Sequence, residues 1–235
     1  MLILSQIKTE VIVLNIKPIA VMRSDLTTKF GIPRQGTLVS CLRGRIVFEK
    51  EYSDIDAFRG IEEYSHLYVI WEFSENKRDN WSTTVRPPRL GGNKRVGVFA
   101  TRSPFRPNAL GLSIVELNGV HRENGVVILD VSGSDLMDGT PIYDIKPYLP
   151  YVDCHPDAKG GFAEERKDYH LDVIIPDIYM DIFSAEKLEA LKAILSQDPR
   201  PSYQDDPNRE YGFEYAGKEV KFKADDGLLI VTEIK

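Results

Sequence analysis

The sequence predicts a mainly β protein in which a β-barrel precedes a small α+β domain. Short strand-like segments fill the first two thirds of the 235 residues, and a convincing helical repeat comes only after them. No run alternates strands with long helices, and neither a G-x-G-x-x-G motif nor a P-loop occurs, which disfavours a doubly wound nucleotide-binding fold. A barrel with an appended domain explains this order of elements better.

The clearest strand is 66–73, HLYVIWEF, which carries bulky side chains on both faces and should therefore be central. The sequence Glu-Asn-Gly at 123–125 marks a hairpin turn, and DGTP at 138–141 has the chemistry of a tight turn. Residues 54–59 should form a single helical turn. The remaining barrel strands are expected at 15–24, 45–49, 112–118 and 126–131.

The one convincing helix begins after Ser184, a favourable N-cap residue, and ends before Pro199. Phe183 is placed to pack on Leu188 as a hydrophobic staple. The apolar helical repeat consists of Leu188, Leu191 and Leu195.

Residues 155–167 are polar and rich in Gly and Pro, and we expect them to link two domains. A strand at 171–175, the helix and two or three strands within 211–234 make up the second unit. We therefore predict a barrel domain at 15–156 and an α+β domain at 168–235.

Charge is distributed unevenly along the chain. Residues 77–106 hold eight Lys or Arg residues against one acid, Asp79, a local charge of +7; because the net charge is −6, the rest of the chain carries −13. A basic patch on an acidic body can steer a polyanion such as RNA to one face.

Two cysteines far apart, Cys41 and Cys154, indicate neither a disulfide framework nor a zinc site. No His/Cys/Asp cluster has ligand spacing, so we expect no metal. The apolar N-terminus is interrupted by Lys8 and Glu10, which argues against a signal peptide or membrane span. We expect a cytoplasmic protein without a membrane partner.

The basic stretch 83–111 contains no carboxylate, and its four prolines and four glycines indicate a stiff, shaped loop. Between its two arms, 95–101 alternates like a strand. Such a loop suits a preorganised site for an anion or nucleotide, although a solvated basic face with ordinary turns would have the same composition. A second loop, 29–36, presents donors from Arg34 and Gln35, or is a plain connection.

Three motifs closely resemble the TsaA-like (TrmO) family: VRPPRLGG at 85–92, GVFATRSPFRPNALG at 97–111, and DGTP at 138–141 followed by DIKPY at 144–148. The likeness covers about 16–156 and continues in the C-terminal motif at 197–203; Ala109-Leu110 departs from the family's proline followed by an aliphatic residue. The resemblance implies a β-barrel enzyme that uses S-adenosylmethionine to methylate N6 of threonylcarbamoyladenosine beside the tRNA anticodon. It also implies a homodimer.

The resemblance further implies which residues bind the cofactor and the tRNA. Arginines and amides suit the methionyl carboxylate, and Asp138 suits the sulfonium or amino group. The implied cofactor residues are Pro33, Arg34, Gln35, Phe73, Ser74, Arg102, Leu112, Asp138, Gly139, Thr140 and Pro141. The expected substrate residues are Arg86, Arg89, Lys94, Arg95, Arg106, Asp198, Arg200 and Tyr203.

No general base is identified by the sequence, because the two candidates, Asp138 and His66, suit binding or structural roles better. Two other functions stay open: a non-catalytic barrel that binds RNA or S-adenosylmethionine, and a structural β protein with a solvated basic face. The joint presence of Arg34, Arg102 and Asp138 in one pocket would favour the enzyme, whereas scattered positions would favour the other two functions.

Overall fold

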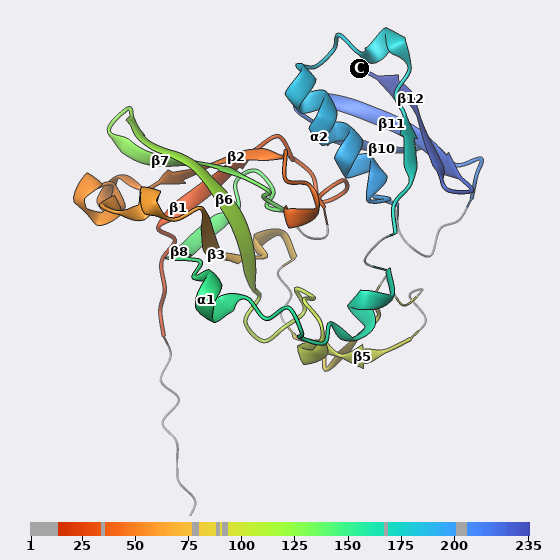
Figure 1. The fold of residues 1–235 in the computed structure, drawn as a ribbon. Helices are drawn as coiled ribbons and strands as arrows, with labels where there is room; N and C mark the ends of the chain where they lie inside the picture. The colour runs from red at the N-terminus through yellow and green to blue at the C-terminus, as the bar shows by residue number, and fades with distance from the viewer. Residues whose placement is uncertain are drawn as a thin grey trace, which may run out of the picture.

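The computed structural model describes residues 14–33, 36–76, 80–87, 90, 94–166, 169–200 and 206–235. It confirms the mainly β class: six strands close a barrel, and a separate four-stranded sheet lies beside it with its helix (Figure 1). The barrel order is β1-β2-β7-β6-β3-β8. Its strands are β1 (Ala20–Ser24), β2 (Arg43–Phe48), β3 (His66–Glu72), β6 (Leu110–Glu123), β7 (Val126–Ser132) and β8 (Pro141–Pro147).

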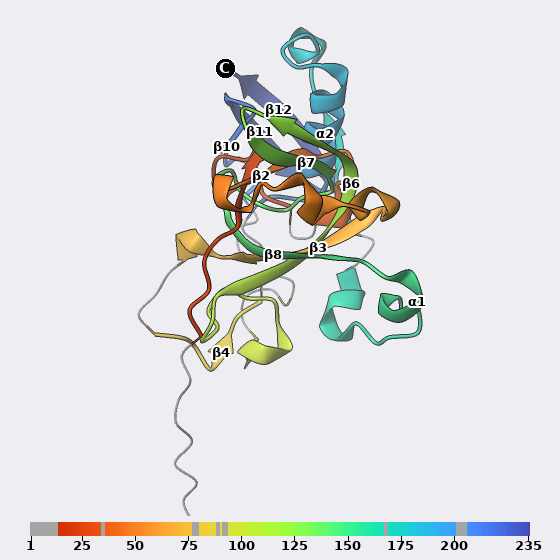
Figure 2. The ribbon, with the colours of Figure 1, turned by 90° about the vertical axis from the view of Figure 1, so that its left-hand side faces the viewer.

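Strand β3 is central, as its sequence predicts. It pairs with β6 on one side and with β8 on the other, and these strands run side by side in Figure 2. Leu67, Val69 and Trp71 point into the barrel core. The β6–β7 hairpin also matches the prediction, because Asn124 and Gly125 adopt φ values of 51° and 83°, as a turn of this kind requires.

Strand β8 is absent from the sequence-based prediction. Prolines stand at both of its ends, Pro141 and Pro147, and proline normally argues against a strand. Here Pro141 lies at the first position of the strand and Pro147 at the last, so neither interrupts its interior; the ladder with β3 shifts register once, between Ile70 and Trp71. Strand β1 is shorter than the expected 15–24, and β6 continues well past the expected end at residue 118.

The expected strand at 95–101 is wrong. Only β5 (Val96–Gly97) is extended, paired with β4 (Thr84–Val85), and the chain then turns into the 3-10 helix η7 (Val98–Ala100). The Thr101 hydroxyl donates to the Val98 carbonyl at 2.8 Å, a local bond that replaces a strand ladder.

Short helices fill the other connections. The expected helical turn at 54–59 is present as η3, whose N-cap Asp54 accepts a bond from the Asp56 amide at 3.0 Å. The stretch predicted as a linker includes a helical segment, η8. The short helices are η1 (Gly36–Leu38), η2 (Lys50–Tyr52), η3 (Ile55–Phe58), η4 (Ile61–Glu63), η5 (Ser74–Asn76), α1 (Pro150–Asp153), η8 (Gly161–Arg166) and η9 (Asp177–Tyr179).

The second sheet has the order β10-β11-β12-β9 and is covered by α2 (Ala185–Ser196). Ser184 caps the helix by accepting from the Lys187 amide, and Leu191 and Leu195 are buried as expected. Three closing strands are present. The strands of this sheet are β9 (Asp172–Ile174), β10 (Tyr211–Tyr215), β11 (Lys218–Asp225) and β12 (Leu228–Ile234).

The loop between β1 and β2 belongs to the core of the second unit. Leu26, Val39 and Leu42 are each 1% exposed and pack in one cluster with α2 and its sheet. Gly31, at φ 94°, allows this close approach, because a Cβ there would lie 2.2 Å from the Phe213 ring. The loop therefore ties the two cores together and carries Pro33 to the mouth of the barrel. Among the described residues, no helix is long and apolar enough to cross a membrane.

Candidate functional site

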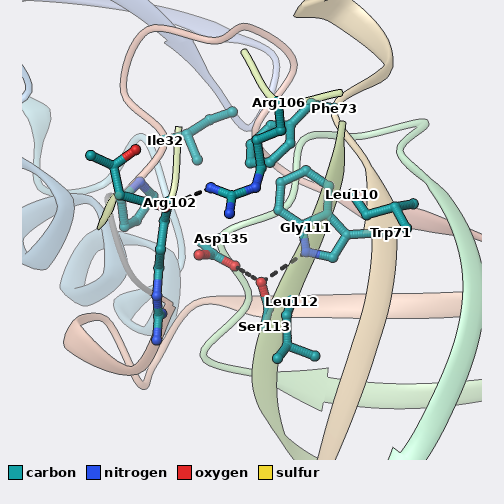
Figure 3. A pocket seen from close by; sticks show the side chains of 12 residues that line it. Ile32, Trp71, Phe73, Arg102, Arg106, Leu110, Gly111, Leu112, Ser113 and Asp135 are labelled. Carbon is teal, nitrogen blue, oxygen red and sulfur yellow. Dashed lines mark hydrogen bonds between the residues drawn. The ribbon is translucent and has the colours of Figure 1, made fainter. Parts of the chain in front are cut away.

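A cavity of about 440 Å³ opens where β3 ends and β6 begins (Figure 3). Its size lies within the range of small-molecule sites. The loop after β1 supplies one wall, the basic loop another, and the segment after β7 supplies a carboxylate. The lining residues are Ile32, Pro33, Trp71, Phe73, Thr101, Arg102, Arg106, Leu110, Gly111, Leu112, Ser113 and Asp135.

The apolar wall depends on a glycine. Trp71 lies directly opposite Gly111 in the β3–β6 ladder, and a Cβ on Gly111 would approach the indole ring to 2.3 Å. The indole therefore lies flat over the strand, with the Phe73 ring centroid 4.3 Å away. Leu112, 57% exposed, adds apolar surface on the same side. This wall can contact a flat, uncharged group such as a base.

Asp135 is the carboxylate among the described lining residues, and no role for it is predicted from the sequence. Its Oδ1 accepts a bond from the Ser113 hydroxyl at 2.6 Å, and Ser113 accepts from the Trp71 indole N–H at 3.0 Å (Figure 3). Burial raises the pKa of Asp135, while the bond from Ser113 and the charge of Arg102 act in the opposite direction. A carboxylate held in this way attracts a cation.

Two arginines face this carboxylate across the cavity. Arg102 is exposed, whereas Arg106 is half-buried and donates through Nη1 to the carbonyls of Val98 at 3.1 Å and Thr101 at 2.6 Å. Arg106 thereby fixes the shape of the loop that carries Arg102. It was expected to bind substrate, and it lies instead in the wall that also holds the predicted cofactor residues.

Of the predicted cofactor residues, four line this cavity: Pro33, Phe73, Arg102 and Leu112. Ser74 follows Phe73 at the start of η5. Arg34 and Gln35 lie outside the described residues.

The turn 138–141 does not line this cavity. Asp138 lines a different pocket, and its Oδ1 accepts from the Ser24 amide at 3.1 Å. The Gly139 amide donates to the Met22 carbonyl at 2.8 Å, Thr140 is buried, and Pro141 pairs with Val21. Within one chain these residues fasten β8 to β1, so Asp138 and Arg102 do not share a pocket.

The predicted substrate residues also fall into two groups. Arg86, Lys94 and Arg95 are exposed on the basic loop, and Arg95 donates to the Thr84 hydroxyl at 2.9 Å. Arg89 and Tyr203 lie outside the described residues.

The other group is a pair close to α2. Arg200 binds both carboxylate oxygens of Asp198, at 2.8 and 3.0 Å, and also donates to the Ala224 carbonyl at 3.1 Å. The two side chains are 10% and 14% exposed. Through these bonds Arg200 attaches the end of the segment after α2 to β11. An incoming anion would have to compete with the Asp198 carboxylate for the Arg200 guanidinium.

His66 lies at the end of β3 that is far from the cavity. It starts the strand whose other end forms the cavity, about 16 Å of extended chain away. Its Nδ1 lies 2.9 Å from the Ser65 hydroxyl, and its ring contacts Tyr148 edge-on. Within the described part of the chain, no three His, Cys, Asp or Glu side chains form a metal site.

Comparisons with known proteins agree with this architecture. The family model for the tRNA-methyltransferase O N-terminal domain matches residues 21–154, and the model for the TrmO C-terminal domain matches 182–235. The tRNA (adenine(37)-N6)-methyltransferase of Escherichia coli K12 is 42% identical over 204 residues, which cover 84% of this chain and 86% of that protein. The enzyme of the same name from Eikenella corrodens is 40% identical, over 73% of this chain and 97% of its own.

A solved structure gives the same result. The crystal structure of TrmO from P. aeruginosa superposes with a TM-score of 0.78 at 30% sequence identity, covering 97% of this chain and 99% of that one. The matched family models, the identity to these relatives and the shared fold show that the chain belongs to the TrmO family.

Proposed function

We propose that the protein is an S-adenosylmethionine-dependent methyltransferase that methylates N6 of adenine 37 in tRNA carrying threonylcarbamoyladenosine at that position. The observation that carries the proposal is the cavity at the barrel mouth, which combines an apolar wall, a half-buried carboxylate and arginines beside an acid-free basic loop. The E. coli and E. corrodens relatives are named tRNA (adenine(37)-N6)-methyltransferases, which supports the reaction and its position in the tRNA.

The lining residues fit the cofactor. S-adenosylmethionine supplies, when bound, a methyl group already activated on a cationic sulfur. Arg102 can pair with a carboxylate, Asp135 can neutralise a positive charge, and the Trp71–Phe73 wall excludes water from an apolar group. A site of this kind accelerates the reaction mainly by holding the reacting atoms in line.

Asp135 is also the group best placed to take up a proton. The N6 atom forms one bond to carbon and loses one hydrogen, so a base must accept a proton. Among the described lining residues the titratable groups are two arginines and Asp135, and an arginine stays charged. The raised pKa of Asp135 makes it a better proton acceptor than an exposed carboxylate.

Several further features belong to the same proposal. The barrel, 15–156, binds the cofactor, and the unit at 168–235 contributes tRNA contacts near Arg200. We infer a homodimer, because Asp138 to Pro141 lie away from the cavity in one chain and a second copy can bring them to it. A cytoplasmic location suits an enzyme that acts on tRNA.

The second candidate function is a protein that binds S-adenosylmethionine without catalysis. A relative from Archaeoglobus fulgidus, 37% identical over 145 residues, carries only the name S-adenosyl-L-methionine-binding protein. The match covers 62% of this chain and 96% of that protein.

Mass spectrometry of tRNA nucleosides separates the two functions. Purified protein is incubated with S-adenosylmethionine and with tRNA that either carries or lacks threonylcarbamoyladenosine. We expect one added methyl group on the modified nucleoside and none on the unmodified tRNA. Cofactor binding without methyl transfer would support the second function, and equal methylation of both tRNAs would contradict the proposed specificity.

A further inference from the structure

We propose that Trp81 and Phe99 form a stacking platform for a base of single-stranded RNA next to the cavity. This inference rests on the proposed function, because it assigns the position of the nucleotide that adjoins the target adenosine. The platform consists of these two rings, and neither belongs to the cavity lining described above.

Both rings are exposed although they are large and apolar. Trp81 is 47% exposed and Phe99 is 68% exposed. Their centroids lie 5.9 Å apart with an angle of 33° between the planes, so the two exposed rings lie side by side as a tilted pair. Exposed aromatic rings that are held together in this way mark binding surfaces.

Backbone bonds fix the platform in place. The Ser82 amide donates to the Phe105 carbonyl at 3.1 Å, and the Val98 amide donates to the Thr83 carbonyl at 3.0 Å. These bonds join the segment that bears Trp81 to the segment that bears Phe99. A platform formed before binding loses little conformational entropy when a ligand stacks on it.

Arg106 connects the platform to the cavity. Its guanidinium carbon lies 5.5 Å from the centroid of Phe99, and the same side chain lines the cavity. A cation against one face of Phe99 stabilises the ring in its position. A base on the platform would therefore be the immediate neighbour of a base inside the cavity.

The charge around the platform selects the occupant. Residues 80–115 contain no Asp or Glu, and the exposed cations Arg86, Lys94 and Arg95 lie on the same loop. Aromatic rings beside cations bind single-stranded nucleic acid, because bases stack on the rings and phosphates meet the cations. An acidic peptide would satisfy the cations but leave the rings without a stacking partner.

The platform also explains how the target could leave its stack. A base in an anticodon loop is stacked on its neighbours, and a modifying enzyme must separate it from them, which costs stacking energy. A neighbouring base that moves onto Phe99 or Trp81 recovers stacking energy from the ring. The adjacent target can then enter the cavity.

The test uses Phe99→Ala and Trp81→Ala in the full-length protein, with Tyr151→Ala as the matched control. Tyr151 is 87% exposed, lies on α1 and is not among the residues that line the cavity. We expect kcat/KM for modified tRNA to fall about 5- to 100-fold in the platform variants, the size of one lost stacking contact. The Kd for S-adenosylmethionine should change less than about twofold, Phe99→Trp should retain activity, and Tyr151→Ala should match the wild type.

A direct measurement of RNA affinity keeps this inference separate from the proposed function. If wild-type protein methylates no tRNA, the proposed function fails. The stacking platform is then tested separately, by comparing the Kd of wild type and of Phe99→Ala for an anticodon stem–loop RNA. Equal RNA affinity of Phe99→Ala and wild type overturns the platform, as does unchanged kcat/KM. Loss of dimers in light scattering, or loss of cofactor binding, would assign the two rings to a second copy or to the cofactor and would also overturn it.

Discussion

The ionised side chain of Asp135 lowers the stability of the folded protein. Burial raises its pKa above the ordinary value of about 3.9, so between the two pKa values the folded chain keeps a proton that the unfolded chain has lost. The stability from this group is therefore greatest below about pH 3.9 and falls as pH rises through the raised pKa. Such a cost is typical of a functional carboxylate.

We predict that Asp135→Asn removes this part of the pH dependence. The free energy of unfolding, measured in urea between about pH 4 and pH 7, should increase for the variant relative to wild type as pH rises, because the variant has no carboxylate to charge. Methyl transfer to tRNA should fall in the same variant. A stability difference that does not change with pH would contradict the assignment, and full activity would contradict the proposed role of Asp135.

Arg102→Ala should weaken cofactor binding more than Arg86→Ala. Arg102 lines the cavity opposite Asp135, and a bond from a charged donor contributes about 1.5–3 kcal/mol, or about 10- to 150-fold in Kd. Arg86 is exposed on the basic loop, so its loss should chiefly lower the salt dependence of tRNA binding, by about one in slope. Calorimetry with S-adenosylmethionine compares the two variants, and equal effects would refute the distinction.

At this scale the sequence predicted the residues that a motif identifies and missed those that only the fold brings together. Phe73, Arg102 and Leu112 were found through the family resemblance, and they share the cavity. Asp135 was missed because its bond to Ser113 joins residues on different elements. The sequence signal that could have revealed Asp135 is an acid next to the apolar Leu136, just after a strand. In the structure both neighbours of Asp135, Ser134 and Leu136, are buried.

Among the elements, β6 offers a matched pair of glycines. A Cβ on Gly111 would meet the Trp71 indole at 2.3 Å, whereas a Cβ on Gly119 would meet nothing closer than 4.0 Å. Gly111→Ala should therefore displace the indole, break its bond to Ser113 and cost about 1–3 kcal/mol, the usual cost of overpacking.

Urea unfolding and cofactor calorimetry measure both effects. Gly119→Ala is the control and should change the free energy of unfolding by less than about 0.5 kcal/mol. Weaker cofactor binding in Gly111→Ala alone would show that the position of the indole matters to the cavity. Equal stability of the two variants would mean that β6 adjusts its backbone to the added methyl group.

The helices and strands with strong local sequence patterns were predicted correctly. Strand β3, the β6–β7 hairpin and α2 have clear periodicity or turn chemistry, and all three are present. Strand β8 was hidden by its terminal prolines, and 95–101 alternates without becoming a strand because Val98 and Thr101 bond to each other. Pairing with the distant strand β3 makes 141–147 a strand, and a local turn at Val98–Thr101 prevents 95–101 from forming one.

For the whole molecule, the shared packing of the β1–β2 loop predicts a single unfolding transition. Leu42 is buried among residues of α2 and its sheet, so Leu42→Ala should cost about 2–5 kcal/mol. Both tryptophans, Trp71 and Trp81, lie outside the second unit and report on the barrel side. Tryptophan fluorescence and calorimetry should therefore give the same Tm, lowered equally by Leu42→Ala. A barrel signal unaffected by this change would show that the two cores unfold separately.

The sequence placed this loop with the barrel, because its neighbours in the chain are barrel strands. Its position against α2 depends on contacts between residues more than a hundred positions apart, such as the bond that Lys187 Nζ donates to Asp25 Oδ1 at 2.8 Å, which no local pattern reveals. The fold class was predictable from the order of elements, whereas the joining of the two cores was not.

The turn at 138–141 bears on how the barrel folds. It closes the barrel where β1 meets β8, and that ladder consists of two residue pairs, Ala20 with Ile142 and Val21 with Pro141. Since these segments are separated by nearly the whole barrel sequence, their pairing requires the closure of a long loop and should be among the last steps of folding. The same seam should open first in the native protein, so the amides of Met22 and Gly139 should exchange with deuterium sooner than those at the centre of β3.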